Sequence, residues 1–194
     1  MAFVNYGSRE VNCKVVYCGP GLSGKTTNIQ QIHARVDPAT RGKLISLTAG
    51  TGRTLFFDFL PLELGNVRGF KTRFHLFTVP GQVLYRQSRK LILRNADGIV
   101  FVADSQVERL EANLESLESL EAALGEQDQS LLGLPVALQY NKRDLPQAVP
   151  LPDLDAALNP HRLPSFPACA LKGEGVLETL KGLATLVLTN VRKK

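Results

Sequence analysis

The chain has 194 residues and a formal net charge of +5, with 44% hydrophobic and 21% charged residues. These values are typical of one globular domain and exclude a disordered, collagen-like or coiled-coil protein. No apolar run approaches the roughly 18 to 20 residues of a membrane span, and the N-terminus has no secretory signal. We therefore expect a cytoplasmic protein that forms a single domain over residues 1–194.

The cysteines and the distribution of charge indicate which kinds of site and partner to expect. Cys13, Cys18 and Cys169 are odd in number and lack CxxC spacing, which favours buried reduced thiols over disulfides or a zinc site. Residues 53–94 hold eight basic and two acidic residues, whereas residues 104–128 hold eight acidic residues and one arginine. Such charge runs are most often solvated surfaces, with an acidic partner or peripheral contact with anionic lipid as the alternatives. No nucleic-acid-binding signature accompanies the charge, so we expect no nucleic acid partner.

Apolar, β-branched segments alternate with helical patterns along the chain. Strands are predicted at 11–18, 43–47, 54–60, 70–79, 98–103, 136–140 and 166–170, and helices at 24–36, 83–94, 108–125, 152–158 and 176–191. This alternation predicts an α/β fold whose mostly parallel sheet has helices on both faces. Residues 43–79 hold three strand patterns and no helix, so an antiparallel meander is expected at one edge.

One predicted helix, 108–125, has leucines opposite its glutamates. Its apolar stripe, which predicts a surface helix with one buried side, consists of Leu110, Leu114, Leu117 and Leu124. A dimerising coiled coil is the weaker alternative, because the pattern lasts only about two heptads.

The strongest motif is GPGLSGKT at residues 19–26, which satisfies G-x-x-x-x-G-K-[ST] between a strand and a helix. Backbone N–H groups of such a loop close around phosphate oxygens. Lys25 is expected to reach the β- and γ-phosphates, and the Thr26 hydroxyl to hold Mg²⁺. The alternative is a glycine turn with an incidental lysine. The predicted phosphate-binding residues are Gly19, Gly21, Leu22, Ser23, Gly24, Lys25, Thr26 and Thr27.

A second motif is expected to bind the base of a nucleotide. The segment 141–144 reads NKRD after a predicted strand and resembles the N-K-x-D motif of Ras-like GTPases. Asp144 there can accept hydrogen bonds from guanine N1–H and the exocyclic amine, which adenine does not offer, so GTP or GDP is the expected ligand. Without the phosphate loop, Asn141 and Asp144 would be interpreted as turn residues before Pro146. The predicted base-binding residues are Asn141, Lys142, Asp144, Ala170 and Leu171, the last two in a segment similar to the last guanine-contact motif.

The segment 78–82, TVPGQ, resembles the D-x-x-G-Q motif of the same proteins. Gly81 is expected to donate its N–H to the γ-phosphate, and Gln82 to orient the attacking water. Thr78 stands where most of that family has an aspartate that helps to hold Mg²⁺. Asp58 is a candidate substitute near the metal, and a solvent-facing charge on an edge strand is the equal alternative.

Further segments resemble one bacterial branch of the Ras-like GTPases. The N-terminal nine residues, RTLFFDFLP at 53–61 and GFKTRFHLFTVPGQ at 69–82 are similar to the MglA family, and the resemblance covers essentially the whole chain. It implies a switch GTPase of gliding motility and cell polarity, recruited to a cell pole, with polarity or motility effectors. It also implies a roadblock-domain partner, MglB, as the GTPase-activating protein.

The same resemblance implies roles for two adjacent residues. Arg53 would act as an arginine finger supplied by the chain itself, and Thr54 would lie in the first switch and contact nucleotide and Mg²⁺. A solvated arginine at a strand start is the alternative for Arg53. Two other functions remain as alternatives: a nucleotide-gated scaffold that hydrolyses little because of Thr78, and a P-loop metabolite kinase. The N-K-x-D segment and the lack of a lid segment disfavour the kinase.

Overall fold

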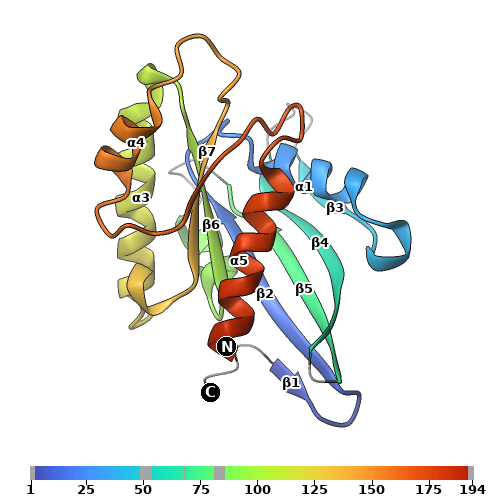
Figure 1. The fold of residues 1–194 in the computed structure, drawn as a ribbon. Coiled ribbons are helices and arrows are strands. Elements are labelled where there is room, and N and C mark those ends of the chain that lie inside the picture. Colours follow the sequence, from blue (N-terminus) through green and yellow to red (C-terminus); the bar gives the residue numbers. More distant parts are fainter. Residues whose placement is uncertain (1–2, 49–53, 68, 81–85, 192–194) are drawn as a thin grey trace.

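The computed structural model describes residues 3–48, 54–67, 69–80 and 86–191 (Figure 1). The strands are β1 (Phe3–Asn5), β2 (Glu10–Cys18), β3 (Ile45–Thr48), β4 (Thr54–Val67), β5 (Phe70–Thr78), β6 (Gly98–Asp104), β7 (Val136–Asn141) and β8 (Ser165–Pro167). The helices are α1 (Lys25–Arg35), α2 (Arg86–Leu93), α3 (Leu110–Gly125), α4 (Leu151–Leu158) and α5 (Val176–Val191). Short 3₁₀ helices cover Pro38–Thr40, Val107–Arg109 and Leu131–Gly133.

The strands form one sheet in the order β3-β4-β5-β2-β6-β7-β8, with β1 paired to β2. The pairs β5–β2, β2–β6, β6–β7 and β7–β8 are parallel. The pairs β3–β4, β4–β5 and β1–β2 are antiparallel. Every residue of β6 and β7 is buried, which is the burial expected of central parallel strands covered on both faces. The predicted α/β fold and its antiparallel edge are confirmed.

Helices cover the two faces of the sheet as separate layers. Alternate residues of β2 point to opposite faces, so that Val15 packs in a core with α1 and α5 while Val16 packs in a core with α3 and α4. In Figure 1, α5 crosses in front of the central strands, and α3 and α4 stand beside β6 and β7. Among the helices that the structure describes, none is long and apolar enough to cross a membrane.

Several expectations differ from the structure; the predicted strand 166–170, for example, is β8 at Ser165–Pro167. Strand β1 was not predicted, because three residues give too short a pattern. Strand β4 continues to Val67, and its pairing with β5 shifts register between Glu63 and Asn66, beside Gly65 at φ 84°. Leu114 is 37% exposed, so placing it in the buried stripe was wrong. The Asn113 side chain faces the sheet instead, bonding the backbone N–H and C=O of Asp104.

The parallel strands place their carboxyl ends at one edge of the sheet. β2, β5, β6 and β7 end at Cys18, Thr78, Asp104 and Asn141, and predicted motifs begin at or directly after the ends of β2, β5 and β7. Ligands of open α/β sheets bind outside this edge. The candidate site is therefore built from several short loops on one rigid support.

Candidate functional site

The loop between β2 and α1 requires glycine at two positions. Gly19 has φ 134° and Gly24 has φ 100°, a region that residues with a side chain rarely adopt. A Cβ on Gly19 would lie 2.2 Å from the Val102 carbonyl oxygen, and one on Gly24 would lie 2.2 Å from Asn141 Nδ2. The loop therefore packs directly against β6 and the end of β7.

Positive charge is concentrated at this loop. The buried Lys25 Nζ donates hydrogen bonds to the carbonyl oxygens of Gly19, at 3.0 Å, and Pro20, at 2.6 Å. The N-cap residue of α1 is Gly24, which makes no side-chain cap, and the first turn of α1 holds no acidic residue. An uncapped helix start beside an ammonium group is a site suited to phosphate oxygens.

A cluster of hydroxyl groups surrounds Asp58, which is only 1% exposed. Asp58 Oδ2 accepts hydrogen bonds from the hydroxyls of Thr26, at 2.7 Å, and Thr78, at 2.8 Å. The Ser46 hydroxyl donates to the other carboxylate oxygen. Of the two alternatives stated for Asp58, a solvent-facing charge is therefore wrong.

These residues fit a magnesium ion. Mg²⁺ keeps several waters and binds proteins through one or two oxygen ligands plus the phosphates of a substrate. The Thr26 hydroxyl donates a hydrogen bond to Asp58, the direction expected when a carboxylate orients an oxygen ligand of a metal. Within the described part of the chain, no group of three or more His, Cys, Asp or Glu side chains forms a metal cage. The donor set suits a metal shared with phosphates.

Asn141 connects the phosphate loop to the predicted guanine loop. Its side chain is buried, its Nδ2 donates to the Ser23 carbonyl at 2.7 Å, and its Oδ1 accepts from the Ala170 N–H at 2.8 Å. One residue at the end of β7 thus holds two loops that are more than 140 positions apart in the sequence. The structure brings the two predicted groups of binding residues together.

Asp144, the last residue of the NKRD segment that begins at Asn141, is exposed. A hydrogen bond from the Cys169 thiol, followed by its own backbone N–H and by Lys172 and Lys142, holds the pKa of the Asp144 carboxyl below its usual range. An ionised carboxylate accepts hydrogen bonds and does not donate them. The group therefore suits a ligand edge that carries N–H donors.

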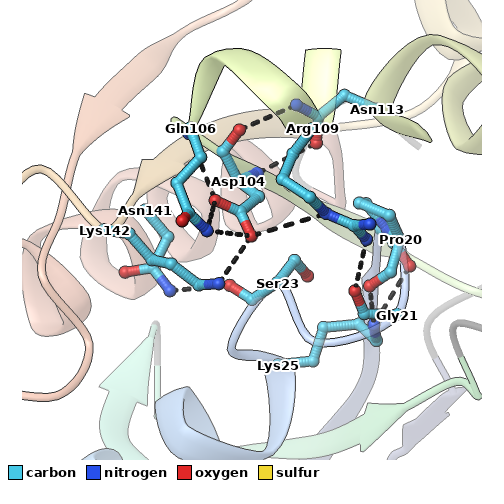
Figure 2. Close-up of polar contacts among 11 residues, drawn as sticks. Pro20, Gly21, Ser23, Lys25, Asp104, Gln106, Arg109, Asn113, Asn141 and Lys142 are labelled. Atoms are coloured by element: carbon cyan, nitrogen blue, oxygen red, sulfur yellow. Dashed lines mark hydrogen bonds and ion pairs between the residues drawn. The ribbon is translucent and has the colours of Figure 1, made fainter. Parts of the chain in front are cut away.

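Asp104 is a site residue that sequence reasoning did not single out. Its carboxylate is fully buried, accepts from Lys142 Nζ at 2.6 Å, and lies 3.9 Å from Arg109 Nε (Figure 2). Sequence reasoning counted Asp104 among the acidic residues of a solvated segment. Its place at the end of a wholly apolar strand was the available signal.

The other predicted residues are placed as follows. Thr27 is in the first turn of α1, and Leu22 and Leu171 are 71% and 76% exposed on their loops. Thr54 begins β4, where its backbone pairs with Thr48. The catalytic candidates Arg53 and Gln82, and also Gly81, lie outside the described residues.

Comparison with known proteins gives the family. The model of the ADP-ribosylation factor family matches residues 2–187. The chain belongs to this family of small GTPases. "Mutual gliding-motility protein MglA" of Myxococcus xanthus (strain DK1622) is 61% identical over 193 residues, which cover 100% of this chain and 99% of that protein. The resemblance expected from the sequence is confirmed: the chain is an MglA-type small GTPase.

More distant relatives are eukaryotic. "ADP-ribosylation factor-like protein 6" of Caenorhabditis elegans is 31% identical over 183 residues, covering 92% of this chain and 87% of that protein. "ADP-ribosylation factor-like protein 4C" of Homo sapiens is 29% identical over 181 residues, covering 90% of this chain and 86% of that protein. Similarity therefore extends over most of the small GTPase domain and beyond bacteria.

Proposed function

We propose that this small GTPase binds GTP and GDP with Mg²⁺, hydrolyses GTP, and acts as a molecular switch. The observation that carries the proposal is the position of Asn141, which hydrogen-bonds both the phosphate loop and the guanine loop. Both ends of one guanine nucleotide would thereby meet the same edge of the sheet. The proposed domain spans residues 1–194.

The binding roles follow from the geometry around this edge. Residues 19–27 would bind the phosphates, with the Lys25 ammonium exchanging its carbonyl partners for phosphate oxygens. The ionised Asp144 would accept from guanine N1–H and the exocyclic amine. The Ala170 N–H and Leu171 would contact the base from the neighbouring loop.

Thr26, oriented by Asp58, would hold the metal together with the nucleotide phosphates, and Thr54 would complete its ligands from the first switch. Bound Mg²⁺ neutralises charge on the β- and γ-phosphates. Asp58 is buried beside Thr26 and bonded to Thr78, so the proposed metal site has a carboxylate although position 78 is a threonine. This removes the main reason to prefer a scaffold that hydrolyses little.

The hydrolytic roles rest on the motifs. Gln82 would orient the attacking water, and Gly81 would donate its N–H to the γ-phosphate. The Arg53 guanidinium would stabilise charge on the transferred phosphoryl group, an effect worth roughly 10³ to 10⁵ in rate.

The biological role is proposed from the relative that shares 61% of its residues with this chain. The switch would control gliding or twitching motility and cell polarity, and effectors would recognise its GTP form at a cell pole. A roadblock-domain protein of the MglB type would stimulate hydrolysis.

Single-turnover hydrolysis of GTP, with and without such a partner, tests this function. Arg53→Ala should keep GTP and GDP affinity within a few-fold and lose most of the stimulated rate, and Arg53→Lys should recover little, because an ammonium lacks the planar fork. The control is Arg41→Ala, since Arg41 donates to His33 Nδ1 instead. Wild-type protein that binds ATP as tightly as GTP, or an Arg53→Ala variant that is stimulated fully, would contradict the proposal.

A further inference from the structure

We propose that Arg109 is a positioning residue of the phosphate loop, which holds the Gly21–Leu22 peptide in its phosphate-binding orientation. Arg109 lies outside every motif, in the 3₁₀ helix that follows β6. The inference rests on the proposed nucleotide binding and adds a residue to it.

The guanidinium of Arg109 spans two groups, as Figure 2 shows. Its Nη2 donates to the Gly21 carbonyl oxygen at 2.9 Å, and its Nε lies 3.9 Å from Asp104 Oδ2. The planar fork of arginine serves two acceptors in fixed directions, which an ammonium cannot do. Arg109 thus connects the phosphate loop to the carboxyl end of β6.

The hydrogen bond to Gly21 fixes the next peptide plane. A trans peptide directs its C=O and its N–H to opposite sides, so the Leu22 N–H points away from the Arg109 guanidinium. Leu22 has φ 66°, a left-handed conformation that is unfavourable for a residue with a side chain. Such a conformation persists where surrounding contacts hold it. The Arg109 hydrogen bond is a contact of this kind, and it turns an N–H group toward the other side of the loop.

Asp104 provides a fixed anchor for this arrangement. It is 0% exposed, and besides the two cations it accepts from the Gln106 backbone N–H at 3.2 Å and from Gln106 Nε2. Lys142, which belongs to the guanine motif, donates to Asp104 Oδ2 at 2.6 Å, the oxygen that also faces Arg109. Asp104 therefore keeps its contacts with Lys142 and Gln106 when Arg109 is replaced, and the base loop keeps its anchor.

The position of the peptide indicates which phosphates are affected. Lys25, expected at the β- and γ-phosphates, donates to the carbonyls of Gly19 and Pro20. Gly21 follows directly, so its peptide lies at this end of the loop and away from the start of α1. Loss of Arg109 should consequently weaken GDP and GTP, and leave GMP, which has only the α-phosphate, unaffected.

The test compares Arg109→Ala and Arg109→Lys with wild type, using the dissociation rate of fluorescent GDP at fixed Mg²⁺ and competition by GMP. Arg109→Ala should release GDP about 10-fold faster or more, as expected for a lost charge-assisted hydrogen bond. Arg109→Lys, which keeps a cation beside Asp104, should show a smaller loss of the same kind. GMP affinity should stay within about twofold in both variants. The matched control is Arg73→Ala, which removes an arginine that pairs with Glu10 at 2.9 Å, far from the loop.

Each outcome decides the inference. GDP release at the wild-type rate in both variants, or equal losses for GDP and GMP, would overturn it, because the second result is that of general destabilisation. If Arg109→Ala fails to fold, the same two measurements on Arg109→Lys decide. Wild-type protein without affinity for GDP would instead refute the proposed function, so the two failures are distinguishable.

Discussion

Thr78 and Asp58 are joined by two hydrogen bonds of opposite direction between neighbouring strands. The Asp58 N–H donates to the Thr78 hydroxyl oxygen at 2.8 Å, and the Thr78 hydroxyl donates to Asp58 Oδ2 at 2.8 Å. Strands β4 and β5 pair antiparallel, so the carboxylate of Asp58 on β4 lies beside Thr78 on β5, the position of the aspartate in the D-x-x-G-Q motif. The threonine that looks like a loss in the motif serves to position Asp58.

Asp58→Asn should weaken Mg²⁺ binding without abolishing nucleotide binding. The amide keeps an oxygen that can accept from Thr26 and lacks the negative charge, and outer partners of metal ligands are worth about 10- to 100-fold in metal affinity. The measurement is the Mg²⁺ concentration that gives half-maximal slowing of GDP release, which should rise by about that factor.

A second variant tests whether the negative charge of Asp58 or its shape is responsible for Mg²⁺ binding. Adding Thr78→Asp to Asp58→Asn moves the carboxylate from β4 to β5 and should recover part of the Mg²⁺ dependence. Thr78→Asp alone crowds two carboxylates in a buried place and should destabilise the fold. An Asp58→Asn variant with wild-type Mg²⁺ dependence would remove Asp58 from the metal site.

Gly24→Ala should disrupt both halves of the nucleotide site at once. The added Cβ would lie 2.2 Å from Asn141 Nδ2, whose amide joins the two loops. Gly69→Ala is the matched control, because Gly69 has a similar positive φ of 81° and nothing lies within 4 Å of the added Cβ. Both variants carry backbone strain of about 1 kcal/mol, which lowers the melting temperature of each. Only Gly24→Ala adds the clash with Asn141, so the difference in GDP affinity between the two variants measures the effect of that clash. Equal GDP affinities would contradict the proposed contact.

The local parts of the site could be predicted from the sequence, and the long-range parts could not. The phosphate loop is a contiguous segment, so its residues were found by spacing. The role of Asp58 depends on how β4 and β5 pair, and it was left open between two alternatives. Asp104 and Leu114 were misjudged for a related reason. Burial at the edges of a helical stripe depends on which residues meet the sheet, and there Asn113 faces inward to satisfy the backbone of Asp104.

His75 should make the fold less stable in mild acid. It lies on β5, where its Nε2 donates to Asn12 Oδ1 on β2 at 2.9 Å and its ring stacks on Phe59 of β4. Burial, followed by the charge of Arg73, lowers the pKa of His75 below its ordinary 6.5. The unfolded chain then takes up the proton first, so stability is fully present above pH 6.5 and falls as the pH drops toward the lowered pKa.

Denaturant titrations between pH 7.5 and pH 5 check this dependence. His75→Gln removes the titrating group, so its free energy of unfolding should fall less steeply with acid than that of wild type. His33, whose pKa is also lowered by burial and by Arg41, gives the remaining slope the same sign. Parallel curves for wild type and His75→Gln would show that His75 does not carry the effect.

Asp144→Asn should change the base preference from guanine to xanthine. In guanine the exocyclic amine donates to a carboxylate oxygen, whereas xanthine has a second oxo group there, which accepts a hydrogen bond from the new amide. A site built around such a pair discriminates by factors on the order of 10⁴, so GTP should be lost and XTP gained together. Competition of GTP and XTP against fluorescent GDP or XDP measures both. Asp153→Asn, the same change on the exposed first turn of α4, is the control and should keep wild-type preference. Unchanged GTP affinity with no gain for XTP would place Asp144 away from the base.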